Sequence, residues 1–115
     1  MSINIVLITL DCVRPGFLGC YGHKDVKTPN IDSLSSQGVI VDRAYSHSSV
    51  TGPSLMSLFT SRFPFDHGVR FNATPAETKL PVMAQILQKH DYRTAAFVGY
   101  YKEWGGSKIK KFSRN

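Results

Sequence analysis

Apolar residues along the chain fall into short runs that predict strands alternating with helices. Residues 4–10 are β-branched and apolar on both faces, which is typical of a strand buried between two layers. Further strands are expected at 39–45 and at 92–98. The strand predicted over 4–10 ends at Asp11. Ligands of open α/β sheets bind beyond the carboxyl ends of the strands. Asp11 is therefore a better functional candidate than an acidic residue elsewhere.

Three segments between the strands carry helical signals. In the first, Thr28 is expected as N-cap, Pro29 as the first helical residue and Gly38 as a left-handed stop. Two more helices are expected over about 52–61 and about 80–90. By their helical spacing, the residues predicted to face the core are Ile31, Leu34, Leu55, Leu58, Phe59, Met83, Ile86 and Leu87. The order strand, helix, strand, helix, helix, strand predicts an α/β layered domain with a mostly parallel sheet.

The composition indicates one small globular domain without a membrane partner. The chain has 115 residues, of which 42% are hydrophobic and 19% charged. Its apolar runs are too short for a membrane span, and no signal-peptide pattern accompanies residues 4–10. Two cysteines, Cys12 and Cys20, in a chain without an export signal are expected to be reduced. These features predict a cytoplasmic location.

The positive charge is concentrated at the end of the chain. The formal net charge is +6 and the isoelectric point is about 9.6. Five lysines and arginines lie in 101–115 against Glu103 alone, and the remainder is only slightly basic. Such a tail can be a nucleic-acid or anionic patch, or a solvated terminus. We favour the terminus, because no aromatic platform or nucleic-acid motif accompanies it. We therefore expect a patterned domain over 1–100, a basic tail over 101–115 and no nucleic-acid partner.

Thr51 lies just ahead of the second predicted helix. A hydroxyl at this point meets the positive end of the helix dipole and unpaired backbone N–H groups. Such a setting favours an alkoxide nucleophile and an anionic substrate. Threonine is also a common N-cap, so a purely structural interpretation of Thr51 stays open at this point.

A series of short motifs connects these candidates. In order they are Asp11, 18–22, 27–32, 44–46, 51–54, 58–64 and 67–69. This series resembles the N-terminal part of the sulfatase family, within the alkaline phosphatase superfamily, over residues 3 to about 98. The resemblance implies an alkaline-phosphatase-like α/β layered sheet, of which this chain would be the N-terminal part only. It also implies metal-dependent hydrolysis of small-molecule sulfate or phosphate esters.

The resemblance also implies roles for individual residues. Asp11 matches a metal ligand, and Thr51 matches the nucleophile and a further metal contact; calcium, manganese or zinc would fit as the divalent metal. Cys12 stands where many sulfatases have a second metal-binding aspartate. It is either a soft metal contact or a small buried residue, and we favour burial near the site. Arg14 is a candidate for binding the substrate anion or for pairing with a surface acid. His47 is expected to face the site as a second substrate-binding residue.

The chain departs from most sulfatases at the nucleophile. Those enzymes carry cysteine or serine there, modified to formylglycine, with arginine four residues later; this chain has Thr51 and Leu55. Threonine cannot form that aldehyde. The pattern is more similar to the phosphodiesterase, phosphonate hydrolase and phosphoglycerol transferase branch, in which an unmodified threonine forms a covalent phospho-enzyme. Whether the substrate is a sulfate ester or a phosphate ester stays open, and Thr51 favours a phosphate ester.

The remaining polar candidates receive structural interpretations. His67 lies beside a helix end and is expected to be structural. Arg62 follows a helix C-terminus, where it complements the dipole. Asp32 and Asp42 are interpreted as surface charges.

The family's remaining metal ligands come from strands much later in members of several hundred residues. We therefore expect an N-terminal fragment that is inactive alone and has the rest of the catalytic domain as its partner. The alternative is a non-catalytic truncated remnant that binds anions or a protein partner.

Overall fold

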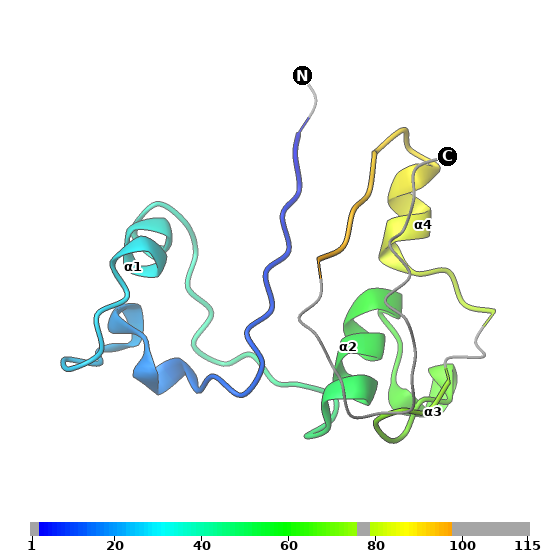
Figure 1. Cartoon of the computed structure of the whole chain (residues 1–115), viewed down its shortest axis with the longest axis horizontal. Coiled ribbons are helices and arrows are strands. Elements are labelled where there is room, and N and C mark those ends of the chain that lie inside the picture. The colour runs from blue at the N-terminus through cyan, green and yellow to red at the C-terminus, as the bar shows by residue number, and fades with distance from the viewer. Residues whose placement is uncertain (1–2, 76–78, 98–115) are drawn as a thin grey trace. The chain divides into compact units, whose positions relative to one another are not determined.

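The computed structural model describes residues 3–75 and 79–97. It divides into two compact units, Met1–Tyr45 and Ser46–Asn115, each with its own local structure (Figure 1). None of the helices in the described ranges is long and apolar enough to cross a membrane. The predicted basic tail and its boundary at residue 100 lie outside these ranges.

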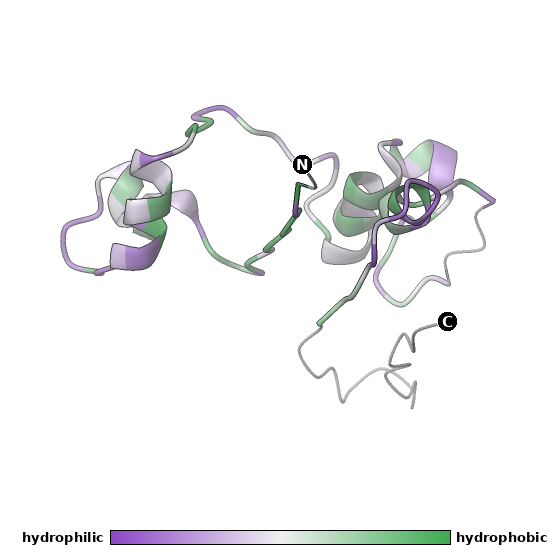
Figure 2. Cartoon of the chain, turned by 90° about the horizontal axis from the view of Figure 1, so that it is seen from above, coloured by the Kyte–Doolittle hydropathy of each residue, from purple (hydrophilic) through white to green (hydrophobic). Residues whose placement is uncertain are grey.

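The predicted layered sheet is not confirmed. Neither 3–75 nor 79–97 contains a strand, and Val98, the last residue of the third predicted strand, is not described. Residues 4–10 follow an extended path with exposed apolar side chains, Val6 at 80% and Ile8 at 72%, and Figure 2 shows this segment as hydrophobic. A strand needs a hydrogen-bonded neighbour, which a local apolar pattern cannot supply. The sheet therefore stays a prediction.

The first unit contains one α-helix and two short 3₁₀ turns. Helix α1 (Pro29–Ser36) packs against the turn η2 (Gly19–Tyr21), and the turn η1 (Pro15–Phe17) precedes η2. The predicted start of α1 is confirmed, with Thr28 as N-cap and proline as the first helical residue. Proline suits this position because its fixed φ is helical and its missing N–H has no partner in the first turn.

A hydrogen-bonded cluster around Asp32 joins α1 to η2. The Asp32 carboxylate accepts the Cys20 N–H at 2.7 Å and the Thr28 hydroxyl at 3.0 Å. The Thr28 hydroxyl in turn accepts the Gly19 N–H at 2.8 Å. A Cβ atom at Gly19 would collide with the Asp32 carboxylate, so glycine allows this close approach. Interpreting Asp32 as a surface charge is therefore wrong, because its half-buried carboxylate organises the unit.

Replacing Asp32 by alanine is expected to free the amide of Cys20. A hydrogen bond to a charged acceptor is worth about 1.5–3 kcal/mol, so hydrogen exchange of this amide should rise about tenfold to a hundredfold. Exchange measured by NMR checks the prediction, with Asp42→Ala, a change at an exposed carboxylate of the same unit, as the control. Equal exchange rates in Asp32→Ala and Asp42→Ala would contradict it.

Two other expectations for α1 are wrong. Gln37 is the C-cap residue, and Gly38 is not among the residues with positive φ, whereas Gly22 of the same unit has a φ of 91°. Ile31 and Leu34 were expected to face the core, but they are 37% and 73% exposed. Helical spacing identifies an apolar face of α1, but the described part of the first unit places no layer over it.

The second unit is built around helix α2 (Thr51–Thr60). Helices α3 (Pro64–His67) and α4 (Met83–Gln88) both pack against α2. The prediction of α2 over 52–61 is confirmed to within one residue at each end. Helix α4 is shorter than the predicted 80–90.

Helix α3 was not predicted, although its ends carry local signals. Pro64 is its first residue, and the Asp66 carboxylate accepts the Phe63 N–H at 3.4 Å. Gly68 ends it with a φ of 76°. Proline at the first position and glycine after the last are the expected asymmetry of a helix. With only four residues, the helix is too short for apolar periodicity to reveal it.

The small core of the second unit uses an unexpected face of α2. Pro53 and Ser57, one turn apart, are buried, together with His67 and Val69. The core-facing stripe predicted from Leu55, Leu58 and Phe59 is wrong at two of its three positions: Leu58 and Phe59 are 47% and 37% exposed, whereas Leu55 is half-buried. His67 at the end of α3 bonds to Ser57, so α3 and the segment after it cover the Pro53 side of α2.

Candidate functional site

Thr51 opens helix α2 and is half-buried. The N-cap is Val50, whose extended backbone has φ −109° and ψ 135° and whose side chain makes no capping bond. The interpretation of Thr51 as the N-cap is therefore wrong by one position, because it is the first helical residue. Its hydroxyl still belongs to the positive end of the helix dipole, where anions and alkoxides are stabilised.

Serine hydroxyls organise the loop that leads to Thr51. The Ser46 hydroxyl lies 2.6 Å from the Ser54 hydroxyl and donates to the Ser48 carbonyl at 2.7 Å. The Ser48 hydroxyl accepts the Val50 N–H at 3.1 Å. The loop is thus bonded both to itself and to the first turn of α2, so the residue before Thr51 has a defined backbone direction.

A residue that follows α3 reaches the same helix start. The Asn72 side-chain oxygen accepts the Gly52 N–H at 2.7 Å. Because Gly52 is the second residue of α2, this is an N-capping interaction supplied from 20 positions further along the chain. Asn72 was not predicted as a site residue, and only its place three residues after the motif 67–69 could have suggested it.

His67 forms a buried link between α3 and α2. Its Nδ1 accepts the Val69 N–H at 3.2 Å, so in the neutral ring the proton is on Nε2. Nε2 then donates to the Ser57 hydroxyl 3.0 Å away. In this arrangement the imidazole does not accept the serine proton, so the pair does not activate Ser57 as a nucleophile. The structural role predicted for His67 is confirmed.

His47, a predicted substrate-binding residue, is exposed and packs against Phe63. Its ring meets the Phe63 ring edge-on, with centroids 4.7 Å apart and planes at 81°. This contact holds His47 beside the start of α3. A role in binding substrate stays a prediction.

The other three predicted site residues belong to the first unit. Asp11 and Arg14 are exposed, and the Arg14 carbonyl accepts the Phe17 N–H of η1 at 3.0 Å. Cys12 is an exposed free thiol with a φ of 58°, a left-handed conformation that L-residues rarely adopt. The expected burial of Cys12 is therefore wrong, because the first unit places no side chains over it.

The metal site is not formed by the described residues. Among 3–75 and 79–97, no group of three histidine, cysteine or acidic side chains could hold an ion. Hard divalent metals take six or more oxygen ligands, whereas the predicted set of Asp11, Cys12 and Thr51 offers a carboxylate, a hydroxyl and a soft thiol. These donors alone do not fit such an ion.

Comparison with known proteins decides the family. The family model described as Sulfatase matches residues 3–114. The chain belongs to the sulfatase family. Membership implies an alkaline-phosphatase-like α/β fold for the family domain, in agreement with the order of elements predicted from the sequence.

Several sulfatases are similar to the chain. Mouse (Mus musculus) iduronate 2-sulfatase is 46% identical over 63 residues, covering 55% of this chain and 11% of that protein. Human arylsulfatase H is 36% identical over 103 residues, covering 79% of this chain and 18% of that protein. The ulvan-active sulfatase of Formosa agariphila is 34% identical over 101 residues, covering 88% and 19%. The chain therefore spans less than a fifth of the length of these sulfatases. No solved structure matches it.

Proposed function

We propose that this chain is the N-terminal part of a sulfatase-like catalytic domain that hydrolyses sulfuric or phosphoric esters with the help of a divalent metal. The observation that carries the proposal is the position of Thr51, which is the first residue of α2 and half-exposed. Family membership supports the reaction class, because the similar proteins are named as sulfatases.

Thr51 would act as the nucleophile. Its hydroxyl oxygen attacks the sulfur or phosphorus atom in line with the ester oxygen, forming a new bond as the bond to that oxygen breaks. The Thr51 proton leaves to a base, and the departing ester oxygen takes up a proton to become an alcohol. Water then hydrolyses the covalent Thr51 ester and releases sulfate or phosphate. The negative charge that the group carries is stabilised by the N-terminal end of α2.

Thr51 favours phosphate among the two ester classes. Formylglycine is formed from cysteine or serine in the sulfatases that use it, and Thr51 cannot be converted to that aldehyde. The reaction open to an unmodified hydroxyl is direct transfer of the phosphoryl or sulfuryl group to its oxygen. We therefore expect phosphodiesters or phosphonate esters to be turned over faster than aryl sulfates.

The cofactor we propose is calcium, manganese or zinc, with Asp11 as one ligand. Family members typically depend on a divalent metal, which polarises the ester oxygens when bound. The described donors are too few for such an ion, so the proposal requires ligands from the rest of the catalytic domain.

Exposed apolar residues support the proposal that the rest of the catalytic domain packs against this chain. In the first unit, Ile3, Val6 and Ile8 are 71%, 80% and 72% exposed. In the described part of the second unit, Val69 is the one large aliphatic residue that is buried. Contiguous exposed apolar segments mark surfaces that another layer covers. We propose that the rest of the catalytic domain provides it.

The test is an ester panel with the whole translated product of the gene that encodes these residues. An aryl sulfate, a phosphodiester and a phosphonate monoester are each assayed with calcium, manganese and zinc, and again after chelation. Turnover of at least one ester that chelation removes supports the proposal. A metal-loaded product that turns over none of the three would overturn it.

A further inference from the structure

We infer that Asn72 is a positioning residue for Thr51, acting through the backbone N–H of Gly52; this rests on the proposed role of Thr51 as nucleophile. The Asn72 side-chain oxygen accepts that N–H at 2.7 Å. The peptide between Thr51 and Gly52 carries the Thr51 carbonyl and the Gly52 N–H. Fixing this peptide restrains the rotation of the Thr51 backbone, and with it the direction in which the Cα–Cβ bond that carries the hydroxyl leaves the helix.

The contact from Asn72 supplies what the N-cap residue of the helix does not, a side-chain acceptor for a backbone N–H of the first turn. Val50 is the N-cap residue and has no polar side-chain atom. Pro53 has no backbone N–H to offer in the first turn. The first backbone bond of the helix runs from the Ser54 N–H to the Val50 carbonyl at 3.1 Å. Ser54 thus holds the peptide before Thr51, and Asn72 holds the peptide after it.

Glycine at position 52 allows Asn72 to approach the start of the helix closely. A Cβ atom there would lie 3.0 Å from the Asn72 side-chain oxygen and 3.4 Å from the Asn72 Cα and the Phe71 carbonyl oxygen. Alanine is the better helix former by about 1 kcal/mol, so helix propensity alone does not favour glycine. The close approach of Asn72 does.

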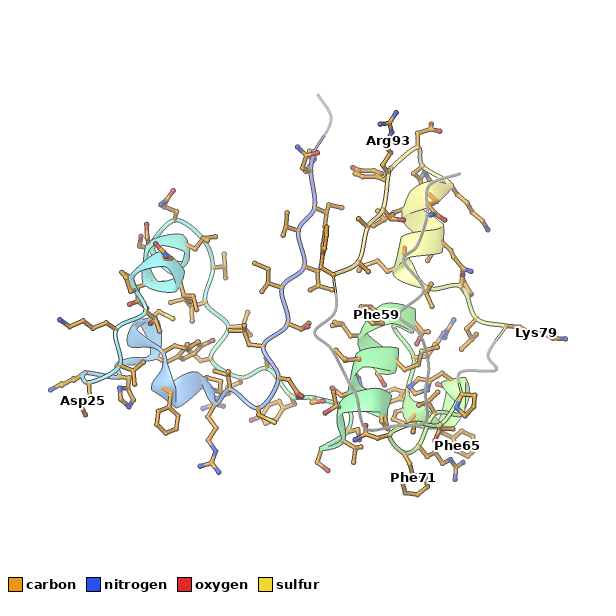
Figure 3. All side chains as sticks on the ribbon, in the orientation of Figure 1. Asp25, Phe59, Phe65, Phe71, Lys79 and Arg93 are labelled. Carbon is orange, nitrogen blue, oxygen red and sulfur yellow. The ribbon has the colours of Figure 1, made fainter. Side chains whose placement is uncertain are left out.

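The segment that carries Asn72 is attached to α2 at two places. His67 bonds to Ser57, and the Val69 N–H bonds back to His67, so the segment starts on the second turn of α2. It ends at Gly52 in the first turn. Figure 3 shows the intervening side chain of Phe71 directed away from α2, and Phe71 is 71% exposed. Asn72, in contrast, turns toward the helix.

The first experiment measures the hydrogen bond without using activity. Asn72→Ala should raise hydrogen exchange of the Gly52 amide about five- to tenfold, the factor expected for one net hydrogen bond. Asn72→Asp should keep the protection, because a carboxylate also accepts this N–H. Asn30→Ala, a change of an exposed asparagine in α1, is the control and should change nothing at Gly52. Unchanged exchange in Asn72→Ala overturns the inference.

The second experiment compares kinetics of the whole translated product with the ester that it turns over fastest. Asn72→Ala should lower kcat about ten- to a hundredfold, since small misplacements of a reacting group have effects of this size, with KM changed less than about threefold. Gly52→Ala should lower kcat in the same direction. The double variant Gly52→Ala/Asn72→Ala should be no slower than Asn72→Ala alone, because both changes remove the same interaction.

The outcomes separate this inference from the proposed function. If Thr51→Ala abolishes turnover while Asn72→Ala leaves kcat unchanged, the inference fails and the function stands. If Asn72→Ala raises KM instead, and Gly52→Ala has no effect, Asn72 touches the substrate and the inference also fails. If Thr51→Ala leaves turnover unchanged, the proposed function fails and takes the inference with it.

Discussion

Replacing Thr51 by alanine is expected to lower ester turnover by at least about 10³-fold, the usual scale for loss of a nucleophile. The variant removes the oxygen that forms the covalent ester and leaves α2 intact, because alanine is the best helix former. Thr51→Ser keeps a hydroxyl at the same place and should retain turnover within about tenfold of the parent. Steady-state kinetics of the whole translated product with the preferred ester measures both.

A matched control comes from the other end of the same helix. Thr60 is the last residue of α2, and its hydroxyl donates to the Met56 carbonyl at 2.7 Å. Thr60→Ala therefore removes a helical threonine without touching the first turn, and should leave kcat unchanged. Equal losses in Thr51→Ala and Thr60→Ala would show that the helix, rather than the nucleophile, had been damaged. No loss in Thr51→Ala would contradict the catalytic role.

The covalent intermediate gives a second measure of the same role. Acid quenching during turnover followed by peptide mass spectrometry should find the phosphoryl or sulfuryl group on the peptide that contains Thr51. The Thr51→Ala product should carry none. A group found on another residue would reassign the nucleophile.

Local sequence signals predicted the two longer helices, α1 and α2, because helix hydrogen bonds join residues four apart. Thr28 and Pro29 mark the start of α1, and α2 lies within one residue of its expected range. A strand, in contrast, needs a partner that is distant in sequence. Residues 4–10 have the composition of a buried strand, but neither described range contains a strand for them to pair with. The sheet could therefore be inferred from the pattern and not seen in the structure.

The same difference between local and distant partners governs the site. Thr51 was identifiable because its motif and its helix are contiguous in sequence. Asn72 reaches Gly52 across 20 positions, and Ser57 reaches His67 across ten. Neither pair has a periodic relation that a single sequence displays. The buried face of α2 was mispredicted for this reason: Pro53 and Ser57 are less apolar than Leu58 and Phe59, and contacts with the segment after α3 decide which side is covered.

Replacing His67 by alanine is expected to have the largest effect on the stability of the second unit. The side chain is 4% exposed, and it satisfies both the buried Ser57 hydroxyl and the Val69 N–H. Its removal leaves these groups without partners and opens a cavity, which together cost about 2–4 kcal/mol. Hydrogen exchange of the Val69 amide measures the loss, and should become at least about thirtyfold faster.

A double-mutant cycle then separates the hydrogen bond from the packing. Ser57→Ala alone should cost about 1–2 kcal/mol, because the Nε2–H group loses its acceptor in a buried site, although alanine is the better helix former. The combined variant Ser57→Ala/His67→Ala should be less destabilised than the sum of the two single variants, because both remove the same 3.0 Å interaction. Additive losses would show that Ser57 and His67 stabilise the unit independently, contrary to the bond that joins α3 to α2. A polar replacement gives a further check of the hydrogen bond: His67→Gln, which can still bond to the Ser57 hydroxyl, should recover more of the coupling than His67→Leu, which offers no polar atom.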